Sequence, residues 1–202
     1  YDYFQKTPLD ETFYTRFLKD RLPARLIDAH AHYDLPEHVK NVTTEAVAGD
    51  WALECGLLMS YEDACAYYRT LLPDTGVYKV ALPWPLRDVD THANNAYVSR
   101  LTEHAEVRSL LTTRPEYDTA LVERTFREGR FSGFKPYPYM ASATKGAEVS
   151  IFEFFTHEQF ALANKLGAPV LMHLPRAGRL PAPENVAEIR VILDRYPNVK
   201  LV

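Results

Sequence analysis

Six short apolar runs alternate with longer stretches of helical periodicity from residue 25 onward. No other feature of the chain constrains its fold as strongly. Each run is nearly continuous in apolar residues, which is typical of parallel strands covered on both faces. Strands that alternate with helices in this way predict an α/β fold with a parallel sheet. The predicted strands are 25–30, 77–82, 107–112, 131–135, 168–173 and a last one that begins at Val199.

The segments between the runs carry the signals that begin and end helices. Small polar side chains that can cap a first turn precede the helical patterns, and glycines at 129 and 167 follow two of them. The chain should therefore turn from each helix into the next strand within a few residues. The predicted N-caps are Ser60, Asp90, Asp118, Thr156 and Asn185.

The length and the spacing of these units predict a TIM-type barrel that is only partly present. An eight-unit barrel takes roughly 250 residues, whereas this chain has 202. We expect one domain over residues 1–202, a (β/α)8 barrel with only its first five to six βα units, and a native protein that extends past Val202. A helical insertion is predicted over 37–75, after strand 1. Phe13, Phe17 and Leu18, at helical spacing, predict a helix within 1–24 that docks on the outside of the barrel.

Charge and composition exclude several classes of function. The chain has 27 acidic and 23 basic side chains, a net charge of −4, which argues against a nucleic-acid partner. No apolar run approaches the roughly 20 residues of a membrane-spanning helix, so we expect no membrane partner and a cytoplasmic location. Cys55 and Cys65 have no metal-type spacing and are expected to be reduced, buried residues.

The strongest chemical signal is Ile27-Asp28-Ala29-His30-Ala31-His32, at the end of the first predicted strand. Residues two apart on a strand point to the same side, so His30 and His32 can reach one metal ion. Two surface histidines at a loop mouth are the alternative. A second apolar strand, 168–173, also ends in a histidine. Barrel enzymes place their chemistry at this end of the strands, so His30, His32 and His173 together predict a metal site.

Further candidates lie at the same predicted barrel end. Lys135 closes the fourth strand, where it is solvated, bound to a substrate anion, chemically altered, or extended past Tyr137 to water. Arg176 follows His173 in a loop and could clamp a carboxylate; solvation is the alternative, and it suits Arg179 better. Trp84 could line an apolar pocket, although core packing explains it equally well, and Tyr137 could donate a hydrogen bond to substrate.

Taken together, these motifs resemble the amidohydrolase superfamily, in particular its amidohydrolase-2 branch. The resemblance runs from about residue 25 to the end of the chain. It implies a (β/α)8 barrel in which His30 and His32 are the first-strand metal pair and His173 the fifth-strand ligand. Lys135 stands where some members carry a carboxylated lysine. The superfamily's sixth-strand His and eighth-strand Asp have no counterpart within residues 1–202. Because that Asp is the usual general base, the chain alone is expected to be inactive.

The resemblance implies a metal-dependent hydrolase that cleaves a C–N or C–O bond of a small carbonyl substrate with a metal-activated water. Non-oxidative decarboxylation of a small carboxylated substrate is the alternative on the same site. A TatD-like nuclease and a non-catalytic half-barrel are further alternatives; such nucleases carry a strand-four glutamate where this chain has Lys135. Zinc is the favoured divalent metal, with manganese or iron as alternatives. The expected partner is a small-molecule substrate, and a homo-oligomer remains open.

Overall fold

The computed structural model describes residues 5–39, 43, 58–141 and 147–202. Six strands form one sheet in the order β1-β2-β3-β4-β5-β6, and each neighbouring pair is parallel. The predicted α/β fold and all six predicted strands are therefore confirmed. The strands are β1 (Arg25–His32), β2 (Gly76–Leu82), β3 (Val107–Leu111), β4 (Gly133–Phe134), β5 (Pro169–Val170) and β6 (Lys200–Leu201).

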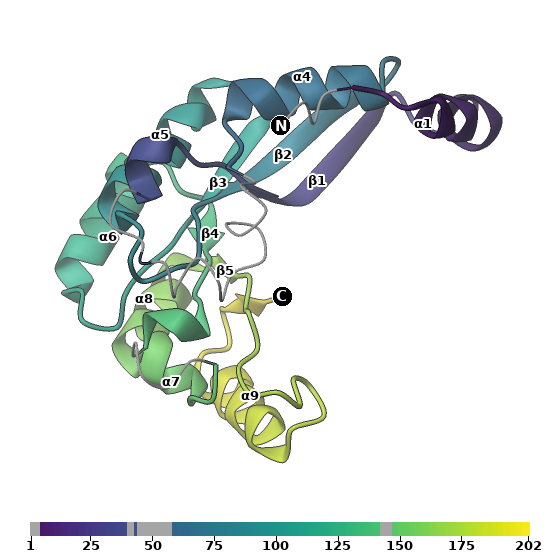
Figure 1. Ribbon diagram of the computed structural model, residues 1–202. Helices are drawn as coiled ribbons and strands as arrows, with labels where there is room; N and C mark the ends of the chain where they lie inside the picture. The colour runs from purple at the N-terminus through teal and green to yellow at the C-terminus, as the bar shows by residue number, and fades with distance from the viewer. Residues whose placement is uncertain (1–4, 40–42, 44–57, 142–146) are drawn as a thin grey trace.

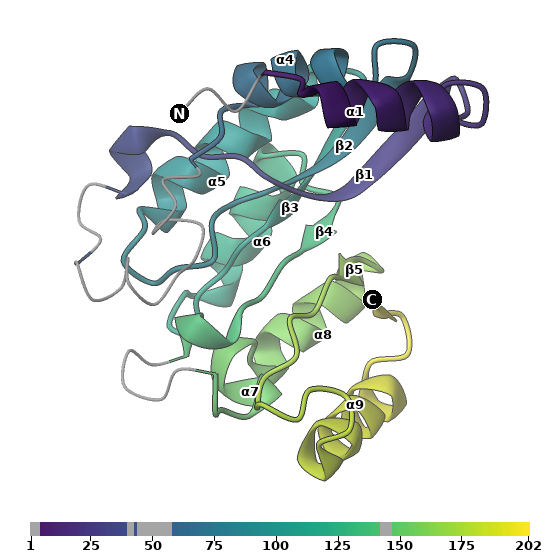
Figure 2. The same ribbon diagram turned by 45° about the vertical axis from the view of Figure 1, so that its right-hand side comes forward.

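The sheet curls into a half-barrel whose convex side carries the helices (Figures 1 and 2). Each crossover moves the chain one strand further in the same direction, and the strand order never reverses. A doubly wound sheet would show such a reversal. The architecture is thus compatible with part of a TIM-type barrel.

The helices begin where the polar caps predict. The Ser60, Asp90, Asp118 and Thr156 side chains each accept a hydrogen bond from a backbone N–H in the first turn of the helix that follows. Gly167 ends α8 with a φ of 61°, a left-handed conformation that glycine adopts without strain. The helices on the convex side are α4 (Tyr61–Leu71), α5 (Thr91–Arg100), α6 (Thr119–Glu128), α7 (Ile151–Phe154), α8 (His157–Leu166) and α9 (Pro183–Arg195).

The predicted cap at Asn185 is wrong. Helix α9 begins at Pro183 with Ala182 as its N-cap, and Asn185 lies inside the first turn with none of its surface exposed. Proline at the first helical position needs no hydrogen-bond partner for its nitrogen, which allows the helix to begin earlier. The Asn185 side chain instead bonds the carbonyls of Pro175 and Arg179 in the preceding loop.

The predicted insertion is described only in part, because 40–42 and 44–57 lie outside the described residues. Its described helical segments are η2 (Pro36–Val39) and α4. Helix α4 packs on the convex side of β1 and β2, where the Tyr61 ring meets the Tyr33 ring edge-on at 5.7 Å. Cys65, on α4, is a half-buried free thiol, and Cys55 lies outside the described residues.

The N-terminal helix docks differently from the prediction. It comprises α1 (Pro8–Phe13) and a π-helical turn, η1 (Tyr14–Leu18). Phe13 and Phe17 are 52% and 41% exposed and contact each other, so they do not form the expected docking face, whereas Leu18 is half-buried. Tyr14 is the buried residue of this segment, and its hydroxyl donates to Asp74 at 3.0 Å. A tyrosine can bury its ring and still satisfy its polar end, which explains why it docks here.

The main core lies between the sheet and its helices. Its fully buried members include Phe134, Phe154, Phe155, Phe160 and Ile192. None of the helices in the described part of the chain combines the length and the apolar composition that crossing a bilayer requires.

Candidate metal and substrate site

A β-bulge in β1 sets the direction of the two histidines. Asp28 pairs with Lys79 and Ala31 with Ala81, so β1 advances three residues where β2 advances two. The bulge keeps both Asp28 and Ala31 on the convex side, where Asp28 meets α4 and Ala31 is buried in the core. His30 and His32 alternate with Ala31 and therefore face the concave side.

The rings of His30 and His32 lie close together, as the sequence predicts. Their centroids are 5.2 Å apart. The pKa of His30 is lowered, first by partial burial and then by the positive charge of Lys135, while Asp28 opposes the shift. His30 is therefore neutral at pH 7 and has a lone pair available to a metal ion.

The hydrogen bonds of His32 define which ring nitrogen is free to bind. Its Nδ1 lies 2.9 Å from the Pro83 carbonyl oxygen, which can only accept, so Nδ1 carries the proton. Its Nε2 then accepts from the Tyr137 hydroxyl at 3.1 Å. Burial lowers the pKa of His32 to about 4. A neutral imidazole whose Nδ1 donates to a carbonyl is the usual form of a metal-binding histidine.

His173 reaches the same region from the segment that follows β5. Backbone hydrogen bonds from Leu171 to Phe134 and from Met172 to Val202 continue the sheet pairing beyond Val170. The His173 ring lies 5.7 Å from that of Tyr137. Burial, followed by the charges of Lys135 and Arg179, lowers the pKa of His173 to about 4. All three predicted ligands are thus neutral and lie at one end of the sheet.

Lys135 is buried beside the three histidines. It is 1% exposed, and its Nζ lies 4.7 Å from the centre of the Tyr137 ring. Burial lowers its pKa to about 8, and its charge lowers the pKa of each of the three histidines. None of the ion pairs among the described residues includes Lys135. A buried ammonium group without a carboxylate partner is stabilised either by binding an anionic ligand or by losing its proton to become a neutral amine.

Two aromatic side chains complete the wall around His32. Tyr137 is 2% exposed, and burial raises its pKa well above the ordinary value, so it remains a hydrogen-bond donor. The Trp84 ring meets His32 edge-on at 5.6 Å. Its buried indole Nε1 has no hydrogen-bond partner among the described residues. Trp84 and Tyr137 therefore both lie beside His32, at the end of the sheet that carries the predicted ligands.

Arg176 does not join this group. Its guanidinium pairs with Glu188 at 2.9 Å and with Asn185, both on α9. The predicted carboxylate clamp is thus occupied by the protein's own side chains. Arg179 is exposed, as expected for a solvated loop charge, and it is also near enough to lower the pKa of His173. Its position in the loop after His173 was the signal available in the sequence.

The ligands do not yet form a closed metal site. Within the described residues, no three His, Cys, Asp or Glu side chains are grouped closely enough to hold one ion. The Tyr137 hydroxyl bonds the free nitrogen of His32, and Asp28 is turned to the convex side. The donor chemistry fits a divalent ion, because neutral imidazoles suit zinc. Binding by all three histidines requires the Tyr137 hydroxyl to release His32.

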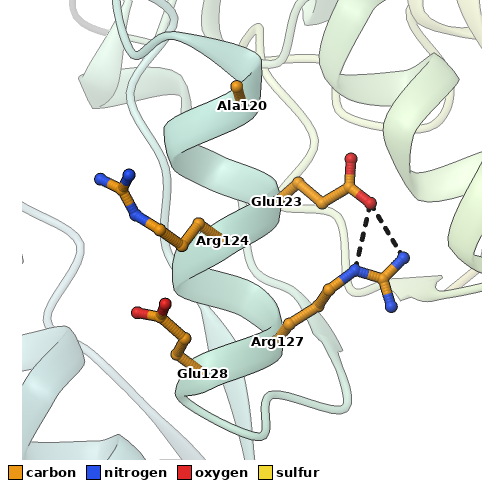
Figure 3. Close-up of a pocket in the computed structure, with 5 residues that line it drawn as sticks. All are labelled: Ala120, Glu123, Arg124, Arg127 and Glu128. Carbon is orange, nitrogen blue, oxygen red and sulfur yellow. Dashed lines mark hydrogen bonds and ion pairs between the residues drawn. The ribbon is translucent and has the colours of Figure 1, made fainter.

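A separate hollow lies on the outer surface of α6 (Figure 3). Glu123 and Arg127, four residues apart, form an ion pair at 2.8 Å, and Arg124 and Glu128 extend along the other side of the helix. Glu123 also binds Lys165 of α8. Charged side chains and pairs of this kind are ordinary on an exposed helix face, so the hollow carries no chemistry of its own.

Comparison with protein-family models and with curated proteins finds no match to this chain. The side chains around His30, His32 and Lys135 are therefore the basis for a functional assignment.

Proposed function

We propose that the protein is a metal-dependent hydrolase that cleaves a C–N or C–O bond of a small carbonyl substrate. The observation that carries this proposal is the His30 and His32 pair on the concave side of β1, with the Nδ1 of His32 anchored to Pro83. A bound divalent ion, zinc first and manganese or iron as alternatives, would supply a water of lowered pKa and a Lewis acid for the carbonyl.

The neighbouring side chains have defined tasks in this reaction. The Tyr137 hydroxyl, once it leaves His32, can donate a hydrogen bond to a substrate oxygen. Lys135 has the pKa of about 8 that suits a group that takes up or releases a proton near neutral pH. Trp84, 9% exposed beside His32, excludes water from one side. Binding, proton transfer and exclusion of solvent are thus available from three residues.

Decarboxylation is the second candidate, and the local charge supports it. Lys135 has no carboxylate partner among the described residues, and both it and Arg179 act as cations on His173. Such a site would attract a substrate carboxylate. In this reaction the bond to the carboxylate carbon breaks, CO2 leaves, and a proton takes its place on the substrate carbon, without addition of water. Comparison of amide and ester substrates with carboxylated aromatic substrates separates the two reactions.

Metal titration tests the proposal directly. Calorimetry with zinc, manganese and ferrous ions on chelator-treated protein should show one site, and His32→Ala should weaken zinc binding by about 100-fold or more, since it removes a ligand. His92→Ala is the matched control, because His92 is exposed and stacks on Tyr117. Absence of metal binding in the unmodified protein, or equal binding by His32→Ala, would overturn the proposal.

A further inference from the structure

The bulged backbone that aims His30 is held from the opposite side of the sheet. We propose that Tyr68 on α4 is a positioning residue for His30 and acts through the carboxylate of Asp28. This inference rests on the proposed function, because it concerns how a metal ligand is held.

Asp28 links α4 to the backbone of His30. One carboxylate oxygen, Oδ1, accepts the His30 backbone N–H at 3.0 Å. The other, Oδ2, accepts a hydrogen bond from the Tyr68 hydroxyl. A single carboxylate therefore joins a helix on the convex side to the backbone of a histidine that faces the concave side.

The bulge makes this link necessary. Strand pairing with β2 is interrupted between Asp28 and Ala31, so His30 has no register partner there. Its backbone N–H is satisfied by Asp28 instead of by a neighbouring strand. This hydrogen bond lies in an exposed part of β1, so without Asp28 the His30 N–H would be open to water and to hydrogen exchange. If Asp28 rotated away, the bulge would lose the bond that fixes its shape, and the His30 ring would lose its direction.

The surroundings of Tyr68 keep the link in place. Lys79, the register partner of Asp28, is 7% exposed. Its Nζ lies 5.8 Å from the centre of the Tyr68 ring, 5.2 Å from that of Tyr61 and 3.5 Å from the Cys65 sulfur. A buried cation against two aromatic faces stabilises this layer. Tyr68 therefore has a fixed orientation from which to hold Asp28.

Tyr68→Phe tests the proposal, with Tyr61→Phe as a matched control. Both residues lie on α4, and each donates its hydroxyl to a carboxylate; Tyr61 donates to Glu106 at 2.8 Å. The first readout needs no metal: amide hydrogen exchange at His30, followed by NMR. We expect exchange about 10-fold faster in Tyr68→Phe and unchanged in Tyr61→Phe. The second readout is zinc affinity, which should fall about 10- to 100-fold in Tyr68→Phe alone.

Variants of Asp28 provide an independent test. Asp28→Ala removes both acceptors and should accelerate exchange at His30 at least as much as Tyr68→Phe does. Asp28→Asn keeps an acceptor oxygen and should have a smaller effect. Equal exchange at His30 in Tyr68→Phe and Tyr61→Phe would overturn the positioning role. Absence of zinc binding in the unmodified protein would instead overturn the proposed function, because exchange at His30 is measured without metal.

Discussion

The burial of Lys135 is difficult to explain by stability alone. Its side chain is 1% exposed, and no described ion pair neutralises it. Proteins hold charges in this way mainly at functional sites, where a perturbed pKa is useful. The surrounding structure must therefore offset the cost of desolvating an ammonium group, which makes Lys135 a residue where stability and function oppose each other.

Replacing this ammonium with an apolar group should stabilise the protein. The pKa of Lys135 falls from its ordinary 10.5 to about 8 through burial, which corresponds to a cost of about 3 kcal/mol at pH 7. We expect Lys135→Met to raise the free energy of unfolding by about 2 kcal/mol in urea titrations and to abolish any hydrolytic activity. Lys165→Met, at a lysine whose side chain is 63% exposed, is the control and should change stability by less than about 0.5 kcal/mol. Lower stability in Lys135→Met would reveal a favourable partner for the ammonium.

The buried histidines predict a loss of stability in acid. His32 and His173 bind a proton near pH 4 in the folded chain but near 6.5 when unfolded. The unfolded state therefore binds more protons between these values, and the free energy of unfolding falls as the pH is lowered from 6.5 to 4. Asp34 opposes this trend, because burial raises its pKa to about 7.

The contribution of His32 is isolated by comparing variants. The urea midpoint of unmodified protein should drop between pH 7 and 4.5 by more than that of His32→Asn, which stays neutral. His104→Asn, at an exposed histidine that stacks on Tyr61, should follow the unmodified protein. Identical pH profiles for His32→Asn and the unmodified protein would mean that His32 does not titrate with the shift proposed here.

Strand periodicity was sufficient to predict the positions of all six strands and the side of the sheet that His30 and His32 share. It could not show that β1 contains a bulge, because the bulge depends on pairing with β2 and on Tyr68, which lies 40 residues from Asp28. The same limit applies to Tyr137, whose hydroxyl reaches His32 across 105 residues. Contacts between distant parts of the chain leave little trace in local sequence patterns.

The interactions of the α9 side chains could not be predicted from the sequence either. The sequence predicts an unpaired loop cation at Arg176, whereas in the structure Glu188 and Asn185 of α9 bind its guanidinium. The sequence predicts a helix N-cap at Asn185, whereas in the structure its amide nitrogen donates to the carbonyls of Pro175 and Arg179 at 2.7 Å each. This helix therefore anchors the loop that follows His173. Local sequence patterns predict which helices and strands form. The packing of these elements decides which polar groups hydrogen-bond to one another.

Removal of this anchor should loosen the loop. Asn185→Ala removes three hydrogen bonds to the loop and leaves the Pro175 carbonyl without its described partner, and we expect it to lower the free energy of unfolding by about 2 kcal/mol. Limited trypsin digestion should also cleave faster after Arg176 and Arg179. Cleavage after Arg124 on α6 is the internal control and should not change. Unchanged cleavage in the loop would show that other contacts fix it.

The half-barrel leaves two strands and several apolar side chains open to solvent. Strands β1 and β6 each have one neighbour within the described sheet. Ile27 on β1 is 72% exposed, and Val202, next to β6, is 69% exposed. Open parallel edges beside exposed apolar residues are templates for association. The six strands position the candidate site, but the described residues leave the concave side uncovered.

The chain of residues 1–202 should therefore self-associate in solution. Sedimentation velocity at micromolar concentration should show species larger than the 23.1 kDa monomer. Ile27→Lys should shift the distribution toward monomer, because it places a charge beside the open edge of β1. Val191→Lys is the control: Val191 is an exposed apolar residue too, 42% exposed, but it lies on helix α9 and not on a strand. A cooperatively melting monomer for the unmodified chain would contradict this prediction.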